Sequence, residues 1–279
     1  MKKILVTGSS GKLGAAVVAL FRAKGYEVRG LDLLPGPATN YLADIRVERD
    51  AQQAVQGCGA IIHTAALHGK HSDLNYPREA FIQTNILGTN HLLQAAVAHG
   101  VQKCIYISTT SIYGYAMARS GTAVWVDEGL PPQPRDIYDI TKLSCEWLCK
   151  DYVDKAGLEA TVLRVSRFLP EDDNTRANHR LYRGLDERDG ARACLLAVET
   201  SLPFFEVFNI SNQSPFRRED LQALYQHPRE VICRYFPEAE EVYRQRDWTF
   251  PACIDRVYDI SKATRLLGFR PEYNFDTFL

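Results

Sequence analysis

Two side chains with complementary acid–base chemistry lie four positions apart in this sequence, Tyr138 and Lys142. On a helix, this spacing places both side chains on the same face. A free phenol, with a pKa of about 10, is a poor base near neutral pH. A nearby ammonium group favours the phenolate and so gives the tyrosine useful acid–base strength. The spacing predicts a proton-handling pair, although Tyr-x-x-x-Lys also arises by chance as a packed tyrosine beside a solvated lysine.

Hydroxyl side chains gather shortly before this pair, in the segment IYISTTSIYG at positions 105–114. The apolar run that opens the segment predicts a buried strand. Ligands of open parallel sheets bind at the carboxyl ends of the strands. We therefore expect the hydroxyls of Ser108–Ser111 to emerge where the side chain of Tyr138 points.

Three glycines near the N-terminus have the spacing of a phosphate-binding turn. Gly8, Gly11 and Gly14 occur in TGSSGKLG, between a predicted strand and a predicted helix. Gly8 permits a tight turn, Gly11 lets the backbone approach a pyrophosphate, and Gly14 lets helix and strand pack closely. Free amides of the first helical turn then meet the anion. The pattern predicts a dinucleotide cofactor.

Two acidic residues indicate which dinucleotide this is. Asp32 ends the second predicted strand, where a carboxylate accepts hydrogen bonds from ribose hydroxyls and repels the 2′-phosphate of NADP. No Arg or Lys follows in 33–38, so NAD is favoured over NADP. Asp44, beside Ile45, either bonds the adenine amino group or caps the helix that follows.

The elements around these residues alternate between short β runs and helical patterns, which is typical of a parallel sheet covered on both faces. We expect helices at 12–24, 78–99, 138–156, 218–226 and 261–267. The expected strands are Lys3–Thr7, Glu27–Leu31, Ala60–His63, Lys103–Ser108, Ala160–Val165 and, returning to the sheet, Glu206–Asn209. The predicted fold is α/β, a Rossmann-type doubly wound sheet formed by residues 1–166, with a small C-terminal substrate-binding lobe at 167–279.

Composition excludes several function classes. The formal net charge is -1, and no basic run is present, which argues against partners such as nucleic acid or an anionic membrane. The first apolar run stops at a glycine turn after four residues, so it predicts a strand rather than a signal peptide or membrane span. The seven cysteines include no CxxC pair and no zinc spacing. We expect no metal and a cytoplasmic protein with reduced thiols.

Taken together, these segments resemble the extended short-chain dehydrogenases/reductases, the NAD-dependent epimerase/dehydratase family. The resemblance covers about residues 3–170 in the family's order, and YDISKATRLLGFRP near the C-terminus is similar to the family's last helix. The matching segments are TGSSGKLG, Asp32, Asp44, HTAA (63–66), NILGTN (85–90), ISTTSIYG (107–114), YDITK (138–142) and LRVSRFLP (163–170).

The resemblance implies a role for further residues. Thr109 takes the place of the catalytic Ser/Thr beside Tyr138 and Lys142, and Asn85 supports the active-site helix. The implied cofactor-binding residues are Gly8, Gly11, Lys12, Leu13, Gly14, Asp32, Asp44, Ile45, Ala65, Ala66, Asn85, Tyr138, Lys142 and Val165. The candidate substrate-binding residues are His68, Thr109, Thr110, Ser111, Arg167, Arg176 and Arg180. His68 is either a substrate contact or simply exposed.

Departures from the family pattern narrow the activity. Thr110 and Ser111 stand where the family's dehydratases carry an Asp-Glu pair, so dehydration is not expected. Arg167 replaces the usual Asn of nucleotide-sugar epimerases, and the loop that follows is short, as in uronate dehydrogenases. There, Arg176 or Arg180 pairs with a sugar carboxylate or is merely a surface residue.

We therefore expect an NAD-dependent oxidoreductase of carbohydrate metabolism that acts on a sugar, sugar acid or similar polyol. The alternative is an epimerase of a sugar or nucleotide sugar that uses the same residues. A non-catalytic NAD-binding regulator is least favoured, because Thr109, Tyr138 and Lys142 are all present. The family commonly dimerises through its two long helices, so 78–99 and 138–156 predict a homodimer.

Overall fold

A computed structural model describes residues 3–68, 74–168 and 170–279. Seven parallel strands form the main sheet in the order β3-β2-β1-β4-β5-β7-β8. Chain order reverses beside β1, which is the topological switch point of a doubly wound sheet. The predicted fold class is confirmed. The strands are β1 (Lys3–Thr7), β2 (Val28–Asp32), β3 (Tyr41–Leu42), β4 (Cys58–His63), β5 (Lys103–Thr109), β7 (Glu159–Val165) and β8 (Phe205–Ile210).

Helices cover both faces of this sheet. On one face, α1 (Lys12–Ala23), α8 (Glu187–Glu199) and α12 (Ser261–Leu267) enclose a core that includes Val17, Phe21 and Phe208. The other face packs against α2 (Glu48–Val55), α5 (Gly88–Ala98) and α6 (Ile137–Ala156). Strands buried on both faces are expected for a parallel sheet.

The expected helix at 78–99 is continuous but not uniform. It begins as α4 (Arg78–Phe81), passes through the π-helical turn η1 (Ile82–Leu87) and continues as α5. A π turn accommodates one extra residue and is frequent at functional sites. Here it contains the buried Asn85.

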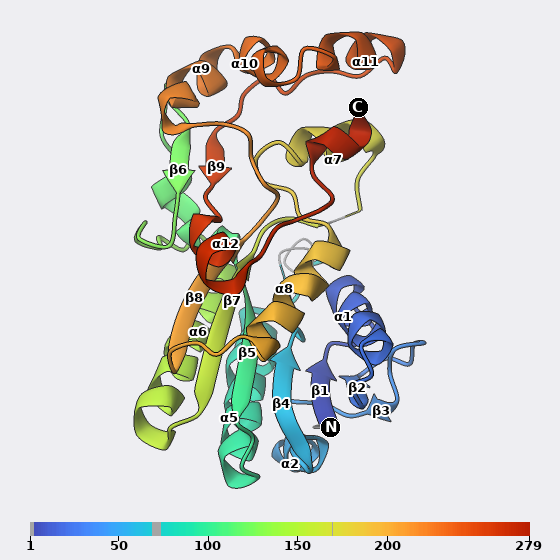
Figure 1. Cartoon of the computed structure of the whole chain (residues 1–279). Helices are drawn as coiled ribbons and strands as arrows, with labels where there is room; N and C mark the ends of the chain where they lie inside the picture. Colours follow the sequence, from blue (N-terminus) through green and yellow to red (C-terminus); the bar gives the residue numbers. More distant parts are fainter. Residues whose placement is uncertain (1–2, 69–73, 169) are drawn as a thin grey trace.

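A small lobe lies beyond the carboxyl ends of the main strands (Figure 1). A two-stranded sheet, β6 (Val124–Val126) with β9 (Arg256–Tyr258), leads into it. A separate apolar core that includes Phe216, Tyr243 and Phe275 holds the lobe together. Its helical elements are α7 (Asp173–His179), η3 (Arg218–Asp220), α9 (Leu221–Gln226), α10 (Pro228–Tyr235), α11 (Ala239–Gln245) and η4 (Phe275–Phe278).

The lobe and the sheet are interleaved along the chain. After residue 166, β8 pairs with β7, and α8 and α12 pack on the main sheet. We propose that residues 1–166 bind the cofactor and that residues 167–279 bind the substrate, even though both parts contribute strands or helices to the main sheet.

Candidate active site

The glycine turn between β1 and α1 is tightly enclosed. Gly8 has a φ of 71°, and a Cβ there would lie 2.7 Å from the backbone nitrogen of Ala65. A Cβ on Gly14 would lie 2.1 Å from the carbonyl oxygen of Gly8. Gly11 is the N-cap residue of α1 and offers no side chain to its amides. The first turn, which starts at Lys12, is therefore open to an anion.

Asp32 orders the loop that follows β2. Its Oδ2 accepts a hydrogen bond from the N–H of Ser10 at 3.0 Å, and its Oδ1 accepts one from the N–H of Leu34 at 3.1 Å. The carboxylate thus joins the second strand to the glycine turn. This is the position from which a ribose would be bound.

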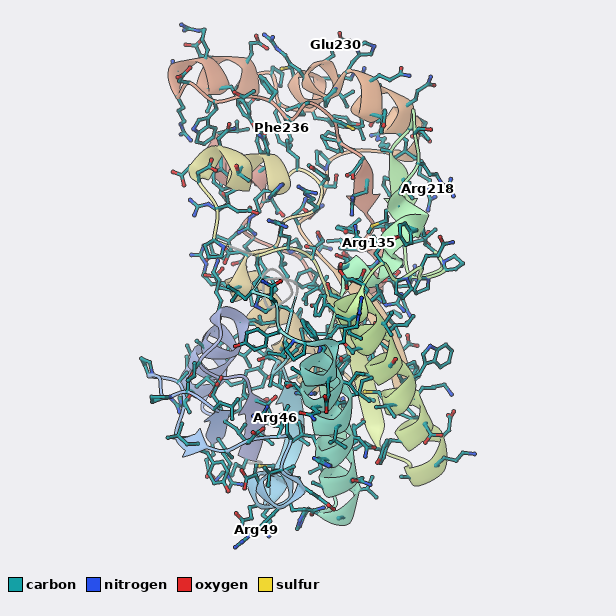
Figure 2. All side chains as sticks on the ribbon, turned by 180° about the vertical axis from the view of Figure 1, so that it is seen from behind. Arg46, Arg49, Arg135, Arg218, Glu230 and Phe236 are labelled. Atoms are coloured by element: carbon teal, nitrogen blue, oxygen red, sulfur yellow. The ribbon has the colours of Figure 1, made fainter. Side chains whose placement is uncertain are left out.

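Asp44 is paired within the chain. The guanidinium of Arg46 donates to both carboxylate oxygens, at 3.0 and 2.9 Å. Burial alone would raise the pKa of Asp44, but the hydrogen bonds from Arg46 hold it below its usual value. Helix α2 has Val47 as its N-cap, so the capping role considered for Asp44 is excluded. Arg46 lies in the half of the molecule that holds the main sheet (Figure 2).

Asn85 ties the segment after β4 to the active-site helix. Its Oδ1 accepts from the N–H of Leu67 at 2.8 Å, while its Nδ2 donates to Leu67 O and to Thr141 Oγ1, both at 2.9 Å. These bonds fix the partly buried segment that contains Ala65 and Ala66. Asn85 therefore supports α6, as the resemblance implies.

His63, at the end of β4, is a neutral structural residue. Its ring nitrogens bond Thr7 Oγ1 at 2.7 Å and Thr89 Oγ1 at 2.9 Å. Burial, with a smaller contribution from the charge of Lys142, lowers the pKa of His63 to about 3. A histidine so buried is not available as a base.

Tyr138 and Thr109 meet at the carboxyl end of β5. Tyr138 lies in the first turn of α6, whose N-cap Asp136 accepts from the N–H of Asp139 at 2.9 Å. Burial raises the pKa of Tyr138 to about 12, the hydrogen bond with the Thr109 side chain lowers it, and the charges of Asp139 and Asp136 raise it again. The side chain of Thr109 is therefore close to the phenol of Tyr138, at the strand end where we expect the hydroxyls of Ser108–Ser111.

Lys142 has a different set of partners. Its Nζ donates to the carbonyl oxygen of Ile107 at 2.5 Å and lies 4.2 Å from the centroid of the Tyr106 ring. Burial lowers the pKa of Lys142 to about 8. We expected this ammonium to lower the pKa of Tyr138. The groups of the chain itself instead raise that pKa, because burial and two carboxylates outweigh the Thr109 hydrogen bond.

The residues after Thr109 bend back toward α6. η2 (Thr110–Met117) begins with Thr109 as its cap, whose Oγ1 accepts from the N–H of Ser111 at 3.1 Å. Thr110 is buried, and Ser111 is partly exposed. Of these two substrate candidates, Ser111 is the more accessible. His68, the remaining substrate candidate in this part of the chain, is partly buried.

Val165, a predicted cofactor contact, is buried at the end of β7. The arginines that follow β7 lie in different surroundings. Arg167 pairs with Glu171. Arg176 is exposed, pairs with Asp173 and stacks on the ring of Phe278, 5.6 Å from its centroid. These contacts direct Arg176 toward the C-terminus of the chain.

Arg180 is the buried arginine among the candidates. Only 5% of its surface is exposed, and its Nη2 donates to Asp186 Oδ2 at 3.0 Å. Its Nη1 is buried without a hydrogen-bond partner among the described residues. A buried guanidinium with an unused donor is costly unless a further acceptor binds.

The chain's family follows from its sequence profile. The profile of the NAD dependent epimerase/dehydratase family matches residues 4–187, more than half of the chain. The chain belongs to this family.

Several known proteins are similar to this family member. A 3-beta-hydroxysteroid dehydrogenase of Mycolicibacterium neoaurum is 31% identical over 184 residues, which cover 62% of this chain and 49% of that protein. A uronate dehydrogenase of Agrobacterium fabrum is 31% identical over 184 residues, covering 63% and 65%. The alignments thus span 49% and 65% of the lengths of these two relatives.

A solved structure extends the likeness to the whole chain. The UDP-glucose 4-epimerase of Thermus thermophilus, in complex with NAD, superposes with a TM-score of 0.70 at 22% identity, covering 99% of this chain and 98% of that one. At this identity the match establishes a shared Rossmann-like fold, small lobe included.

NAD is the cofactor of this family member, and the site fits it. Any side chain at Gly8 would collide with Ala65, so the turn keeps the space that a diphosphate needs. Asp32 stands where ribose hydroxyls would be held. The described residues contain no group of three or more His, Cys, Asp or Glu that could hold a metal ion. Within the same residues, no helix is long and apolar enough to cross a membrane.

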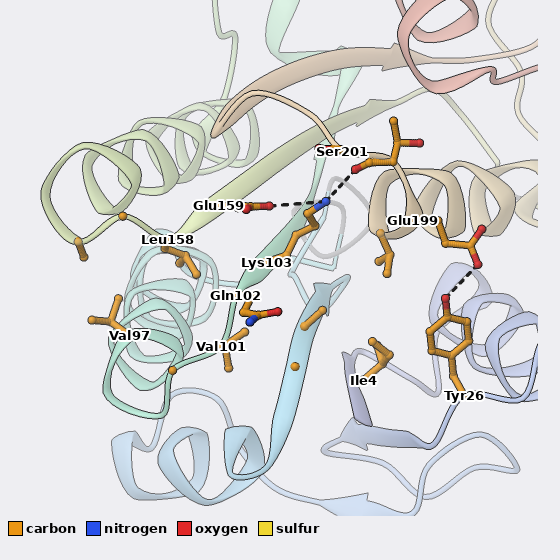
Figure 3. A pocket seen from close by; sticks show the side chains of 17 residues that line it. Ile4, Tyr26, Val97, Val101, Gln102, Lys103, Leu158, Glu159, Glu199 and Ser201 are labelled. Carbon is orange, nitrogen blue, oxygen red and sulfur yellow. Dashed lines mark hydrogen bonds and ion pairs between the residues drawn. The ribbon is translucent and has the colours of Figure 1, made fainter. Parts of the chain in front are cut away.

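A depression of about 730 Å³ lies at the opposite, amino end of the strands (Figure 3). Its polar groups pair with one another: Lys103 Nζ donates to Thr200 O at 2.9 Å, and Tyr26 Oη donates to Glu199 at 2.9 Å. It lies far from the carboxyl ends of the strands and contains none of the candidate site residues.

The sequence did not predict a row of hydrogen-bonded side chains that follows β7, formed by Glu171, His179 and Arg183. His179 Nδ1 donates to Glu171 Oε2 at 2.7 Å, and Arg183 Nη2 donates to His179 Nε2 at 2.7 Å. Because an arginine only donates, Nε2 must accept and Nδ1 must carry the proton. The i, i+4 spacing of His179 and Arg183 was the available signal.

Proposed function

We propose that the protein is an NAD-dependent dehydrogenase that oxidises a hydroxyl group of a sugar acid or related sugar. The observation that carries this proposal is the approach of the Thr109 side chain to the Tyr138 phenol at the carboxyl end of β5. Two hydroxyls from different elements converge there, near a glycine turn that fits NAD. A substrate hydroxyl that bonds both oxygens is held for proton removal.

In this mechanism, Thr109 and Tyr138 orient the reacting hydroxyl, and the Tyr138 oxygen takes its proton. When bound, NAD supplies the acceptor for the hydride that leaves the same carbon. Lys142 would hold the ribose of the nicotinamide half, and the positive charge of the oxidised ring would lower the pKa of Tyr138, which burial raises. Thr109 then donates to the carbonyl oxygen that develops.

The surroundings of Arg180 favour an anionic substrate. Its unpaired Nη1 is a buried donor, and a carboxylate is the acceptor that a guanidinium binds best. Arg176, the other candidate, is engaged by Asp173 and Phe278. The similarity to a uronate dehydrogenase supports the same choice.

The test is oxidation of a panel of uronic acids, aldoses and nucleotide sugars with NAD, followed by NADH absorbance and by NMR of the sugar. We expect NADH to accumulate with a sugar acid. We also expect Arg180→Met to raise KM for that acid at least tenfold, about 1.4 kcal/mol, with Arg176→Met as the control near wild type. Interconversion of epimers without NADH would identify the alternative, an epimerase. If no substrate in the panel produced NADH or changed in the NMR spectrum, the proposal would be contradicted.

We further propose that the protein is a homodimer. Five apolar side chains on α4–α5 and α6 are unusually exposed: Ile82 (46%), Leu87 (42%), Val97 (41%), Ile140 (49%) and Trp147 (68%). Exposed apolar side chains on neighbouring helices mark protein–protein contacts, and two such helix pairs form a four-helix bundle. All seven cysteines are free, and reduced thiols are typical of the cytoplasm, where we place the protein.

A further inference from the structure

A charged cluster lies directly behind the active-site tyrosine. Asp139, the neighbour of Tyr138, is completely buried, with 0% of its surface exposed. Its Oδ2 accepts from the N–H of Arg135 at 3.2 Å and lies 3.5 Å from the Nε of the same arginine. Its Oδ1 has no hydrogen-bond partner in the part of the chain that the structure describes.

Ser111 connects this cluster to the reacting groups. Its hydroxyl lies against the Asp139 carboxylate and accepts from Arg135 Nη2 at 3.2 Å. Its N–H donates to Thr109 Oγ1, and Thr109 in turn bonds Tyr138. A continuous path of contacts therefore runs from Arg135 to the phenol. Arg135 lies where the main sheet meets the small lobe (Figure 2).

Burying a carboxylate whose oxygen lacks a hydrogen bond lowers the stability of the fold. Ionisable groups in such strained surroundings are frequent at functional sites. Burial raises the pKa of Asp139, while Ser111 and Arg135 lower it. Among the described residues, Asp139 and Asp136, the N-cap of α6, act on the charge of Tyr138, and Arg135 from the preceding loop pairs with Asp139. Lys142 lies one turn further along α6, and its Nζ contacts Ile107 O. Both aspartates oppose formation of a phenolate.

We propose that Asp139 is a positioning residue that, held by Arg135 and Ser111, sets how readily Tyr138 releases its proton. Asp139 keeps the phenol protonated when the site lacks positive charge, and Arg135 partly cancels that effect. Proton acceptance by Tyr138 then depends on the positive ring of oxidised NAD, so that the base is formed only with the cofactor that can take the hydride.

This arrangement predicts shifts of opposite sign for two substitutions. Asp139→Asn keeps the shape of the side chain and removes the negative charge, so Tyr138 should ionise about one pH unit lower. Arg135→Gln removes the compensating positive charge, so Tyr138 should ionise at a higher pH than in wild type. Loss of a purely structural contact would not produce opposite shifts. Asp154→Asn, which removes the same charge from the far end of α6, should leave the onset unchanged.

The measurement is a pH titration of tyrosine labelled with ¹³C at the phenol carbon, in the full chain saturated with NADH. The Tyr138 signal is assigned by its loss in Tyr138→Phe, and circular dichroism defines the pH range in which each variant stays folded. The order of ionisation onset should be Asp139→Asn, then wild type, then Arg135→Gln. Equal onsets in all three, or shifts in the same direction, would overturn the proposal. No substrate is needed, so the result is independent of the reaction proposed above.

Discussion

The four-residue spacing places Tyr138 and Lys142 on one side of α6, but their polar atoms contact different groups. The phenol bonds Thr109, and the ammonium bonds Ile107 O beneath the end of β5. Lys142 is a charged group in a buried place, with 3% of its surface exposed. Such a residue is retained for function at the expense of stability.

The cost of burying Lys142 predicts a pH dependence of stability. Folding lowers its pKa from 10.5 to about 8, so between these values the unfolded chain binds the proton more readily. The contribution of Lys142 to the free energy of unfolding should therefore rise with pH across this window, by up to about 3 kcal/mol. In Lys142→Met this rise should be absent, whereas the exposed control Lys150→Met should retain it. Urea denaturation of the three proteins below and above the window measures the difference, and parallel curves would contradict it.

At the scale of elements, a buried polar network joins the catalytic strand β5 to α6 and to the neighbouring strands β7 and β8. Arg164 of β7 donates to both carboxylate oxygens of Glu146 on α6, and Ser108 of β5 donates to Glu146 as well. Arg164 also donates to Tyr113, which donates to Asn209 of β8. The network thus fixes the strand that ends in Thr109.

Breaking this network should destabilise the protein strongly. Glu146→Gln leaves the guanidinium of Arg164 buried without its counter-charge, which costs about 3–5 kcal/mol. Asp154→Asn breaks the exposed Lys150–Asp154 pair on the same helix and should cost no more than about 0.5 kcal/mol. Chemical denaturation near neutral pH compares the two variants. If both variants lost the same free energy of unfolding, the network would not stabilise the fold more than an exposed ion pair does.

Elements were predictable from the sequence wherever a local pattern determines them. The apolar runs predicted six strands of the main sheet to within two residues, because strands buried on both faces need such runs. The π turn in 82–87 was not predicted, because its apolar spacing is also that of an α-helix. The contacts of Asp139 and Arg180 were not predicted either. Asp139 contacts Ser111, which comes from a distant segment of the chain, and Arg180 pairs with Asp186 across the irregular turn at 181–184, so helical spacing predicts neither contact.

At the scale of the whole molecule, the sheet carries the glycine turn, and the small lobe lies beyond the carboxyl ends of its strands. Several apolar side chains on the two long helices, α4–α5 and α6, remain exposed to solvent. Trp147 is the most exposed of them, at 68%. A large aromatic side chain on a helix surface is typical of the centre of an interface.

Trp147→Glu should therefore convert the proposed dimer into a monomer, because a carboxylate in the middle of an apolar interface is left without a partner. The matched control is Phe204→Glu, an exposed aromatic outside these helices, which should remain dimeric. Sedimentation velocity at micromolar concentration distinguishes the two states. A wild-type monomer under these conditions would rule out the dimer.

The most direct test of the enzyme assignment compares Tyr138→Phe with wild type and with Tyr115→Phe, an exposed tyrosine of η2. NADH binding is measured by fluorescence, and oxidation of the best sugar acid by NADH formation. We predict that all three proteins bind NADH alike, that Tyr115→Phe keeps its rate, and that Tyr138→Phe loses about 10²–10⁴-fold in kcat. A Tyr138→Phe variant that binds NADH and oxidises the substrate at the wild-type rate would contradict the account.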